Sequence, residues 1–265
     1  MDHPKELSVA PNFDWLSQGF PQISANLKYL NNLSNKDGEK LALVFELMDM
    51  NLYELISGAK TYLPSYRIKY IIFQVLKAIY HMHKNGIFHR DIKPENILIR
   101  GDDIKLADFG CCKGIFAEPP YTEYISTRWY RPPECLLTDG FYDSKIDIWG
   151  IGCVLFEVIS LNPLFPGDDE LDQINKIHKV LGTPSPEVLA LYQQLATHMD
   201  FDFKETVGCG IEAMIGETTP DCLDILKKLL AYEPHKRISA GEALRHEYFH
   251  EILEKEMEKE FEKSL

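Results

Sequence analysis

The spacing of apolar residues predicts that most of this chain is helical. From Ser65 to Met82, apolar residues recur three and four positions apart, which is typical of a helix with one buried face. Residues 146–159 are apolar on nearly all sides and predict a central, buried helix. Another apolar stripe predicts a helix closed by Gly182; its members are Leu171, Ile174, Ile177 and Leu181.

Strand signals are confined to the first half of the chain. Residues 41–47, Leu-Ala-Leu-Val-Phe-Glu-Leu, are expected to form a buried strand. Two short apolar runs, 97–99 and 104–106, flank Arg-Gly-Asp-Asp and predict a β-hairpin. Asn51 and Ser239 are each followed by Glu three residues later, and this capping-box spacing predicts two further helix starts. The pattern as a whole indicates an α+β chain with few strands.

Composition and charge narrow the class of protein. Apolar residues make up 45% and charged residues 26% of the chain, which is ordinary globular composition. A formal net charge of −13 argues against a nucleic-acid groove or an anionic membrane surface as partner. Six cysteines without a C-x-x-C spacing predict reduced, mostly buried thiols rather than a disulfide scaffold or a zinc site. Neither a bilayer span nor a signal peptide is indicated.

The stretch from 88 to 110 carries the candidate chemistry. It contains His-Arg-Asp-Ile-Lys-Pro-Glu-Asn and then Asp-Phe-Gly, which resembles the catalytic and metal-binding loops of the protein-kinase family. The resemblance implies that Asp91 accepts the proton of a substrate hydroxyl and that Lys93 neutralises charge on the transferred phosphoryl group. Asn96 would supply a neutral oxygen to Mg²⁺ and Asp108 a charged one. The predicted hairpin between them returns Asp108 to the side of Asn96.

Three further residues resemble structural positions of the same family. Glu134 ends Arg-Pro-Pro-Glu, where the family has Ala-Pro-Glu, and the resemblance implies that it pairs with Arg237. Asp147, in Asp-Ile-Trp-Gly, matches the aspartate that holds the catalytic-loop backbone. These residues would keep the loop preorganised rather than touch a substrate.

The segment around 122 is similar to the dual-phosphorylation motif of mitogen-activated protein kinases. It reads Thr122-Glu-Tyr124. By this resemblance Arg128 and Arg131 would bind a phosphate on Tyr124, and Arg90 would receive an activation-loop phosphate. The alternative, in which the tyrosines of this segment simply pack the loop, stays open.

Taken together, residues 41–249 resemble the CMGC group of kinases, and within it the MAPK/MAK/MRK-overlapping kinases of the MAK/RCK-like family. This implies a proline-directed serine/threonine kinase that uses ATP and Mg²⁺, acts on protein substrates and answers to an upstream activating kinase. Phe45 would be the gatekeeper, and Glu46 to Met48 the hinge that binds adenine. Leu98 would close the adenine pocket from below. The family also implies a cytoplasmic location, with nucleus or cilium as further sites.

The region before the hinge departs from the family pattern. A complete kinase has Gly-x-Gly-x-x-Gly, a lysine in Val-Ala-x-Lys and a helix glutamate there, and residues 1–40 contain none of them. We therefore expect a kinase-like fold with a truncated N-lobe sheet. The expected division is a residual N-lobe and hinge strand (1–48), a complete C-lobe (49–250) and an acidic, solvated helical tail (251–265). A truncated or alternatively started gene product fits this pattern, and a gene-model error would give the same sequence.

Two functions from different classes remain. The first is a serine/threonine kinase with weak activity, since losing even one comparable electrostatic contact costs on the order of 10²–10³ in rate. The second is a non-catalytic lobe that binds other proteins. A third idea, a hydrolase that uses Asp91 and Asp108 as a carboxylate pair, leaves Lys93, Asn96 and Glu134 unexplained.

Overall fold

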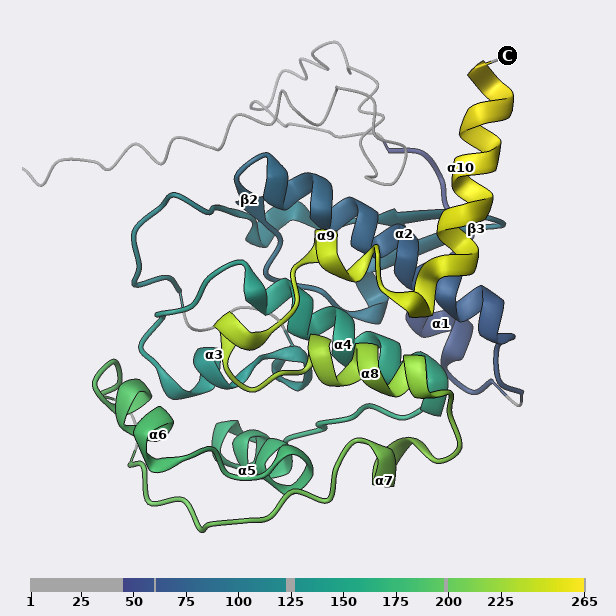
Figure 1. Cartoon of the computed structure of the whole chain (residues 1–265). Coiled ribbons are helices and arrows are strands. Elements are labelled where there is room, and N and C mark those ends of the chain that lie inside the picture. The colour runs from purple at the N-terminus through teal and green to yellow at the C-terminus, as the bar shows by residue number, and fades with distance from the viewer. Residues whose placement is uncertain (1–44, 60, 123–126, 198–199, 265) are drawn as a thin grey trace, which may run out of the picture.

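Short antiparallel strands and a larger set of helices form the part of the chain described by the computed structural model, residues 45–59, 61–122, 127–197 and 200–264 (Figure 1). Residues 1–44, which hold most of the predicted N-lobe remnant, lie outside this part. The strands are β1 (Met50–Asn51), β2 (Ile87–Phe88), β3 (Ile97–Arg100), β4 (Asp103–Leu106) and β5 (Lys113–Gly114). The helices are α1 (Leu52–Ile56), α2 (Ser65–Lys84), α3 (Pro133–Leu137), α4 (Lys145–Ser160), α5 (Glu170–Leu181), α6 (Pro186–Gln193), α7 (Glu212–Ile215), α8 (Pro220–Leu229), α9 (Ala240–Ala243) and α10 (His250–Ser264).

The central sheet has the strand order β1-β3-β4 and is antiparallel throughout. The predicted hairpin is confirmed: Ile97 pairs with Leu106 and Leu98 with Lys105. Because side chains alternate along a strand, Leu98 and Arg100 share the face opposite to the buried Ile97 and Ile99. The hairpin therefore offers one face to the core and the other to the segment that precedes β1.

Helices α2 and α4 form the core on which the other elements pack. Helix α2 contacts α4, α9 and β4, and α4 contacts α8. The predicted apolar face of α2 is buried, and α4 is buried from Ile146 to Val158, as its nearly uniform apolar pattern predicts. Both predicted capping boxes are present, at Asn51 with Glu54 and at Ser239 with Glu242.

Two sequence expectations are wrong in detail. The described part of the predicted strand 41–47 is irregular and exposed, with Phe45 at 49% and Leu47 at 86% exposure. No described strand pairs with it, and ladder pairing begins only at Met50. Leu171 is exposed rather than buried, because the packed face of α5 begins one turn later, at Gln173 and Ile174.

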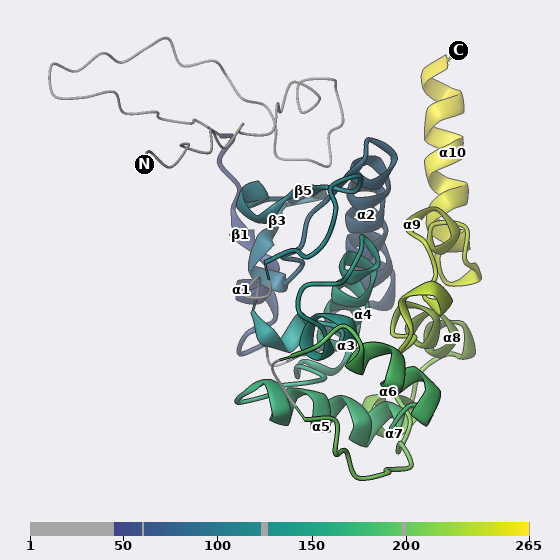
Figure 2. The ribbon, with the colours of Figure 1, turned by 90° about the vertical axis from the view of Figure 1, so that its left-hand side faces the viewer.

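The last helix, α10, begins against the body of the molecule and then projects away from it (Figures 1 and 2). In its first turns Ile252 is buried, and Glu256 accepts hydrogen bonds from Gln74 (2.8 Å) and Lys77 (2.5 Å) of α2. The first turns of the predicted solvated tail are therefore packed, with Ile252 buried and the Glu256 carboxylate bonded to α2.

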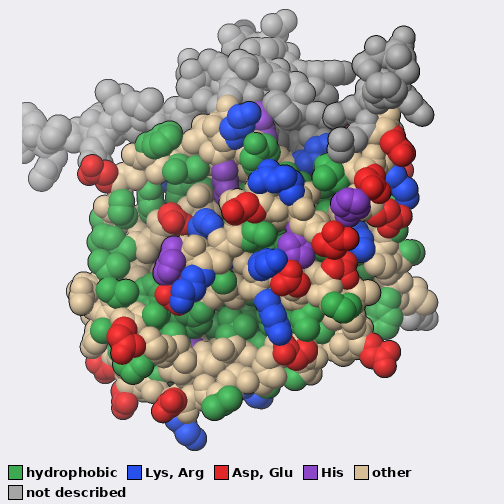
Figure 3. All heavy atoms as spheres, in the orientation of Figure 1, with side chains coloured by type: hydrophobic (Ala, Val, Ile, Leu, Met, Phe, Trp, Pro, Cys, Tyr) green, Lys and Arg blue, Asp and Glu red, His purple; other side chains and the backbone are tan. Residues whose placement is uncertain are grey.

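The distribution of charge can be followed on one face of the molecule. On the face seen in Figure 3, acidic, basic and histidine side chains are interspersed rather than gathered by sign. Among the described residues, no helix combines the length and the apolar character needed to cross a bilayer.

Candidate active site

The predicted catalytic loop is anchored from below by Asp147 of α4. One carboxylate oxygen accepts the backbone N–H of His89 (2.9 Å) and the other that of Arg90 (2.8 Å). His83 of α2 lies 2.8 Å from the same carboxylate. Burial opposes ionisation of Asp147, but the hydrogen bond and charge of His83 and the His89 contacts hold its pKa below the ordinary value. A charged, buried acceptor thus fixes two consecutive backbone groups.

His89 acts as a structural link in the same loop. Its Nε2 lies 3.0 Å from the carbonyl oxygen of Ala107, and its Nδ1 accepts the backbone N–H of Asp91 (3.3 Å). Burial lowers the pKa of His89, which keeps the ring neutral. With Nδ1 as acceptor, Nε2 carries the proton and donates to Ala107. His89 therefore joins the loop to the residue before Asp108.

Asp91, Lys93 and Asn96 converge on one carboxylate oxygen. Asp91 Oδ2 lies 2.9 Å from Lys93 Nζ and accepts a 2.9 Å hydrogen bond from Asn96 Nδ2. Asn96 Nδ2 also donates to the Asp91 backbone carbonyl at 2.9 Å. Burial alone would lower the pKa of Lys93, but the hydrogen bond and charge of Asp91 raise it. Lys93 stays protonated, and the carboxylate of Asp91, only 4% exposed, is held in one orientation.

The hairpin brings Asp108 back to this cluster. The backbone N–H of Ala107 donates to the Asn96 carbonyl (2.9 Å), so Asp108 follows a residue bonded directly to Asn96. Asp108 has φ 63° and is exposed, and its Oδ1 accepts from Gly110 N at 3.3 Å. Arg90, also a non-glycine residue at positive φ (71°), flanks the cluster on the other side. Backbone strain of this kind is held by surrounding structure and concentrates at functional sites.

The donor set of Asn96 and Asp108 fits Mg²⁺. The Asn96 side chain donates through its amide nitrogen to the Asp91 backbone carbonyl and to its carboxylate, which leaves the amide oxygen as the atom able to bind a cation. Mg²⁺ is typically bound by one or two protein oxygens together with water and substrate phosphate, and not by a protein cage.

Helix α4 approaches the loop closely at Gly150. A Cβ atom at this position would lie 2.9 Å from Cβ of Ile92 and 3.2 Å from its carbonyl oxygen. Both distances are shorter than ordinary van der Waals contact. The residue between Asp91 and Lys93 therefore rests directly on the helix backbone.

Glu134 and Arg237 form a buried, two-pronged ion pair. The guanidinium nitrogens lie 2.6 and 3.0 Å from the two carboxylate oxygens, and both side chains are fully buried. Arg237 also donates to the carbonyls of Ala231, Lys145 and Tyr232 and lies over the Trp149 ring. Such complete pairing is what a buried charge requires. The pair ties the start of α3 to the chain before α9.

The structure links Arg90 to the segment of Thr122 through a tyrosine. Arg90 Nη1 donates to the hydroxyl of Tyr142 (3.0 Å), and that hydroxyl donates to the backbone carbonyl of Thr122 (2.8 Å). Thr122 is exposed. Burial, with smaller contributions from neighbours, raises the pKa of Tyr142 to about 12, so the hydroxyl keeps its proton. Tyr124, the second predicted phosphosite, lies outside the described residues.

Arg128 and Arg131 lie against the start of α5. Arg128 Nη1 donates to the Asp168 carbonyl at 2.9 Å, and Arg131 Nη1 lies 3.3 Å from Glu170. Arg90 and Arg131 line one small cavity with Tyr130. In the part of the chain that the structure describes, Arg128 Nε is buried and has no hydrogen-bond partner.

The predicted hinge lies beside the hairpin face that carries Leu98. Phe45 is half exposed and Leu98 is partly buried. The Glu46 carboxylate forms ion pairs with Lys105 and Arg100. Sequence reasoning missed these two basic residues, together with His83 and Tyr142. Lys105 could have been found from the sequence, because the predicted hairpin places it directly opposite Leu98.

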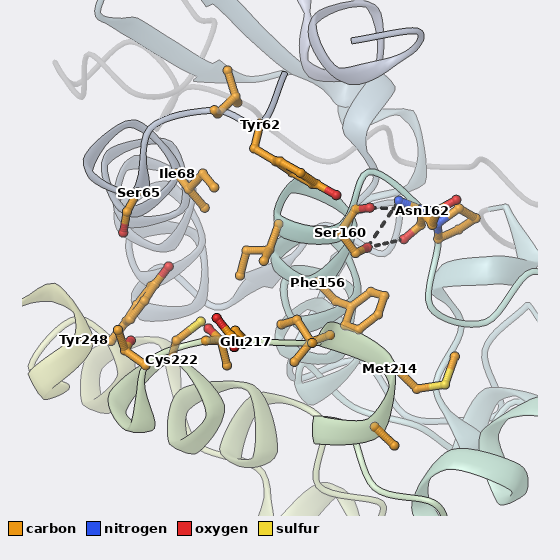
Figure 4. Close-up of a pocket in the computed structure, with 18 residues that line it drawn as sticks. Tyr62, Ser65, Ile68, Phe156, Ser160, Asn162, Met214, Glu217, Cys222 and Tyr248 are labelled. Atoms are coloured by element: carbon orange, nitrogen blue, oxygen red, sulfur yellow. Dashed lines mark hydrogen bonds between the residues drawn. The ribbon is translucent and has the colours of Figure 1, made fainter. Parts of the chain in front are cut away.

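A cavity of about 1110 Å³ lies elsewhere, between the starts of α2 and α8 and the end of α4 (Figure 4). Tyr248 and Cys222 line one end of it, and Ser160 and Asn162 the other. Its lining contains none of the predicted site residues. The candidate active site is therefore defined by its chemistry and not by cavity size.

Comparison with known proteins agrees with this geometry. The protein kinase domain model matches residues 21–249. The human and mouse proteins named MAPK/MAK/MRK overlapping kinase are 54% identical over 211 and 209 residues, which is 80% and 79% of this chain and 50% of each relative. Rat serine/threonine-protein kinase ICK is 42% identical over 215 residues, 81% of this chain and 34% of that protein. The chain spans half or less of these relatives.

These matches confirm the predicted resemblance and the α+β kinase fold with its largely helical C-lobe. The matched range contains the anchored loop, the hairpin and the Glu134–Arg237 pair. This chain belongs to the protein kinase family.

Proposed function

We propose that this chain transfers the γ-phosphoryl group of ATP to serine or threonine hydroxyls of protein substrates. The observation that carries the proposal is the position of Asp91. Its carboxylate is buried, ionically paired with Lys93 and hydrogen-bonded by Asn96, beside the residue pair that fits Mg²⁺. The names of the relatives support serine/threonine as the acceptor, and Thr122-Glu-Tyr124 supports a proline-directed enzyme.

In this mechanism Asp91 orients the acceptor hydroxyl and takes its proton as the oxygen attacks phosphorus. The bond between the γ-phosphorus and the β,γ-bridging oxygen breaks, and ADP leaves with that bridging oxygen. Lys93 remains protonated and neutralises charge on the transferred group. Asn96 and Asp108 would hold Mg²⁺, which supplies charge neutralisation on the phosphates when it is bound. Glu46, Met48 and Leu98 would bind the adenine ring.

Phosphorylation of Thr122 and Tyr124 by an upstream kinase is part of the same proposal. The chain of hydrogen bonds from Arg90 through Tyr142 to Thr122 supports it, because a change at Thr122 is two contacts away from the residue before Asp91. Arg128, whose buried Nε has no hydrogen-bond partner among the described residues, and Arg131 are the further candidate partners for a phosphate.

The test is Mg²⁺-dependent transfer from ATP to a Ser-Pro peptide and to a matched Ser-Ala peptide. Asp91→Asn keeps the shape and the acceptor atom near Lys93 but removes the base, so we expect activity to fall on the order of 10²–10³-fold. Asp102→Asn, on the exposed hairpin turn, is the matched control. Undiminished activity in the Asp91 variant contradicts its role. Equal rates on the two peptides contradict proline direction.

A second candidate is a lobe that binds proteins without catalysis. Residues 1–40 carry no Gly-x-Gly-x-x-Gly and no Val-Ala-x-Lys, which favours it. Nucleotide titration separates the two functions, because a ligand at one hundred times its Kd stabilises the fold by about 2.7 kcal/mol. A catalytic lobe should show this rise in melting temperature with Mg·ATP, and a purely protein-binding lobe should not.

A further inference from the structure

We propose that Arg100 and Lys105 are positioning residues that hold the hinge in the conformation that recognises adenine. This inference rests on the proposed function, because it deepens the nucleotide-binding part of that proposal. It assigns to two basic side chains of the hairpin a role in ligand selectivity and not only in hairpin stability. Neither residue would touch the nucleotide.

The hairpin register places both residues on the face that carries Leu98. Lys105 pairs directly opposite Leu98, and Arg100 directly opposite Asp103. Directly opposed residues of an antiparallel pair project to the same face, and so do residues two apart on one strand. Leu98, Arg100, Asp103 and Lys105 therefore line one surface. It is the surface on which the predicted adenine pocket rests.

Arg100 and Lys105 contact the hinge at three points. Arg100 Nη1 donates to the backbone carbonyl of Leu47 (3.1 Å), and Nη2 lies 3.2 Å from Glu46 Oε2. The same Nη2 also donates to Asp103 Oδ2 at 2.9 Å. Lys105 Nζ pairs with Glu46 Oε1. The Glu46 carboxylate is thus shared between two cations from neighbouring strands.

These contacts fix which backbone groups of the hinge point away from the hairpin. The Leu47 carbonyl turns toward Arg100, and the Asp49 N–H donates to the Ile99 carbonyl of β3 (3.1 Å). The backbone groups of Leu47 and Asp49, two residues apart, thus both point toward β3, as alternate residues of an extended chain do. Within the described residues, the intervening Met48 N–H and the Glu46 carbonyl form no backbone hydrogen bond, so they are left for a ligand.

A donor N–H next to an acceptor carbonyl selects adenine over guanine. The adenine edge offers an amino donor beside a ring-nitrogen acceptor, whereas guanine offers a carbonyl acceptor beside a ring N–H donor. A site that fixes this pair rejects the wrong base, because the mismatched polar groups lose their partners. Releasing the Leu47 carbonyl would let the pair rotate out of this arrangement.

Burial separates this arrangement from an ordinary surface ion pair. The Lys105 side chain is 9% exposed and that of Glu46 16%, although Arg100 remains 41% exposed. In the described part of the chain, Glu46 is the acceptor that Lys105 Nζ contacts. A mostly buried ammonium held by a hinge carboxylate is costly to leave unpaired. The carboxylate therefore stays on the hairpin face.

The experiment measures dissociation constants of the full chain for Mg·ATP and Mg·GTP by calorimetry. Arg100→Ala and Lys105→Met remove the two cations, and Arg100→Lys keeps the charge near Glu46 but cannot bind the Leu47 carbonyl and the Glu46 carboxylate at the same time through two nitrogens. Arg67→Ala is the matched control, because Arg67 bonds Asp102 and Gly101 at the turn of the same hairpin without touching the hinge.

We expect Arg100→Ala and Lys105→Met each to weaken ATP binding roughly ten-fold and to leave GTP binding within about two-fold, so that the ATP/GTP preference collapses. Arg100→Lys should be intermediate, and Arg67→Ala should keep the preference. A lower melting temperature with an unchanged preference would overturn the proposal and leave a structural role. Wild-type chain that does not prefer ATP overturns the proposed nucleotide site itself, and this inference with it.

Discussion

The catalytic loop and the hinge lie at the two ends of one β-hairpin, but different kinds of contact hold them. The loop is fixed by Asp147 of α4, and the nearby Glu134–Arg237 pair ties α3 to the chain before α9. The charged groups of both are buried and hydrogen-bonded on several sides. The hinge is fixed by side chains of the hairpin, one of them well exposed to solvent. The loop end belongs to the core of the molecule, and the hinge end to its edge.

This difference has an energetic meaning. A buried charge that loses its partner keeps its desolvation cost, so each member of the loop network is strongly needed. A partly exposed pair can exchange its partner for water and is weakened by salt. We therefore expect the loop to lose its geometry only when the fold as a whole is destabilised. The hinge, in contrast, can change its conformation while the fold stays intact.

The largest effect is expected where the buried network is cut. Arg237→Ala leaves Glu134 charged and unpaired, and should lower the free energy of unfolding by about 3–5 kcal/mol, measured by urea denaturation. Lys228→Ala, which removes a half-exposed pair with Asp224, is the control and should cost less than about 0.5 kcal/mol. Similar losses in the two variants would remove the distinction between core and surface pairs.

A smaller effect is expected directly beneath the loop. Asp147→Asn has one acceptor oxygen in place of two, so either the His89 or the Arg90 N–H loses its charged partner. We expect the free energy of unfolding to fall by about 2 kcal/mol. Hydrogen exchange at these two amides should speed up roughly thirty-fold, while the Asp49 amide is unchanged. Faster exchange at both ends of the hairpin would show that loop and hinge are one unit.

The smallest effect is expected at the hinge. Glu46→Gln removes the charge shared by Arg100 and Lys105 but keeps an amide oxygen that Lys105 can still donate to, so it should cost only about 1 kcal/mol of stability. In 1 M salt, where the screening length is about 3 Å, the difference from wild type should shrink. The same salt should leave the cost of Arg237→Ala nearly unchanged, because that pair is buried. The free energy of unfolding of wild type and of both variants is measured by urea denaturation at low and at high salt.

The sequence predicted the helical core and the loop residues because their signals are local. The apolar pattern of α2 and α4, the two capping boxes and the hairpin turn follow from residues a few positions apart. The loop motif is contiguous from His89 to Asn96, and the hairpin fixes its distance from Asp108.

The remaining features depend on residues far apart in the chain. His83 meets Asp147 across 64 residues, and Arg100 meets Leu47 across 53. No local pattern indicates such contacts. In residues 45–47, the described part of the strand expected at 41–47, Phe45 and Leu47 are exposed, because an apolar run is buried only where another element covers it, and no described element covers these two side chains.

The close contact between Gly150 and Ile92 limits how the thermal stability of this protein can be increased. Glycine inside a helix costs up to about 1 kcal/mol relative to alanine, so α4 is less stable than its own length allows. Engineering toward higher thermal stability normally begins at such positions. Here the added methyl group would displace the peptide that joins Asp91 to Lys93, and a gain in helix stability would be opposed by a loss of catalytic geometry. At Gly150 of the central helix, stability and activity therefore oppose each other.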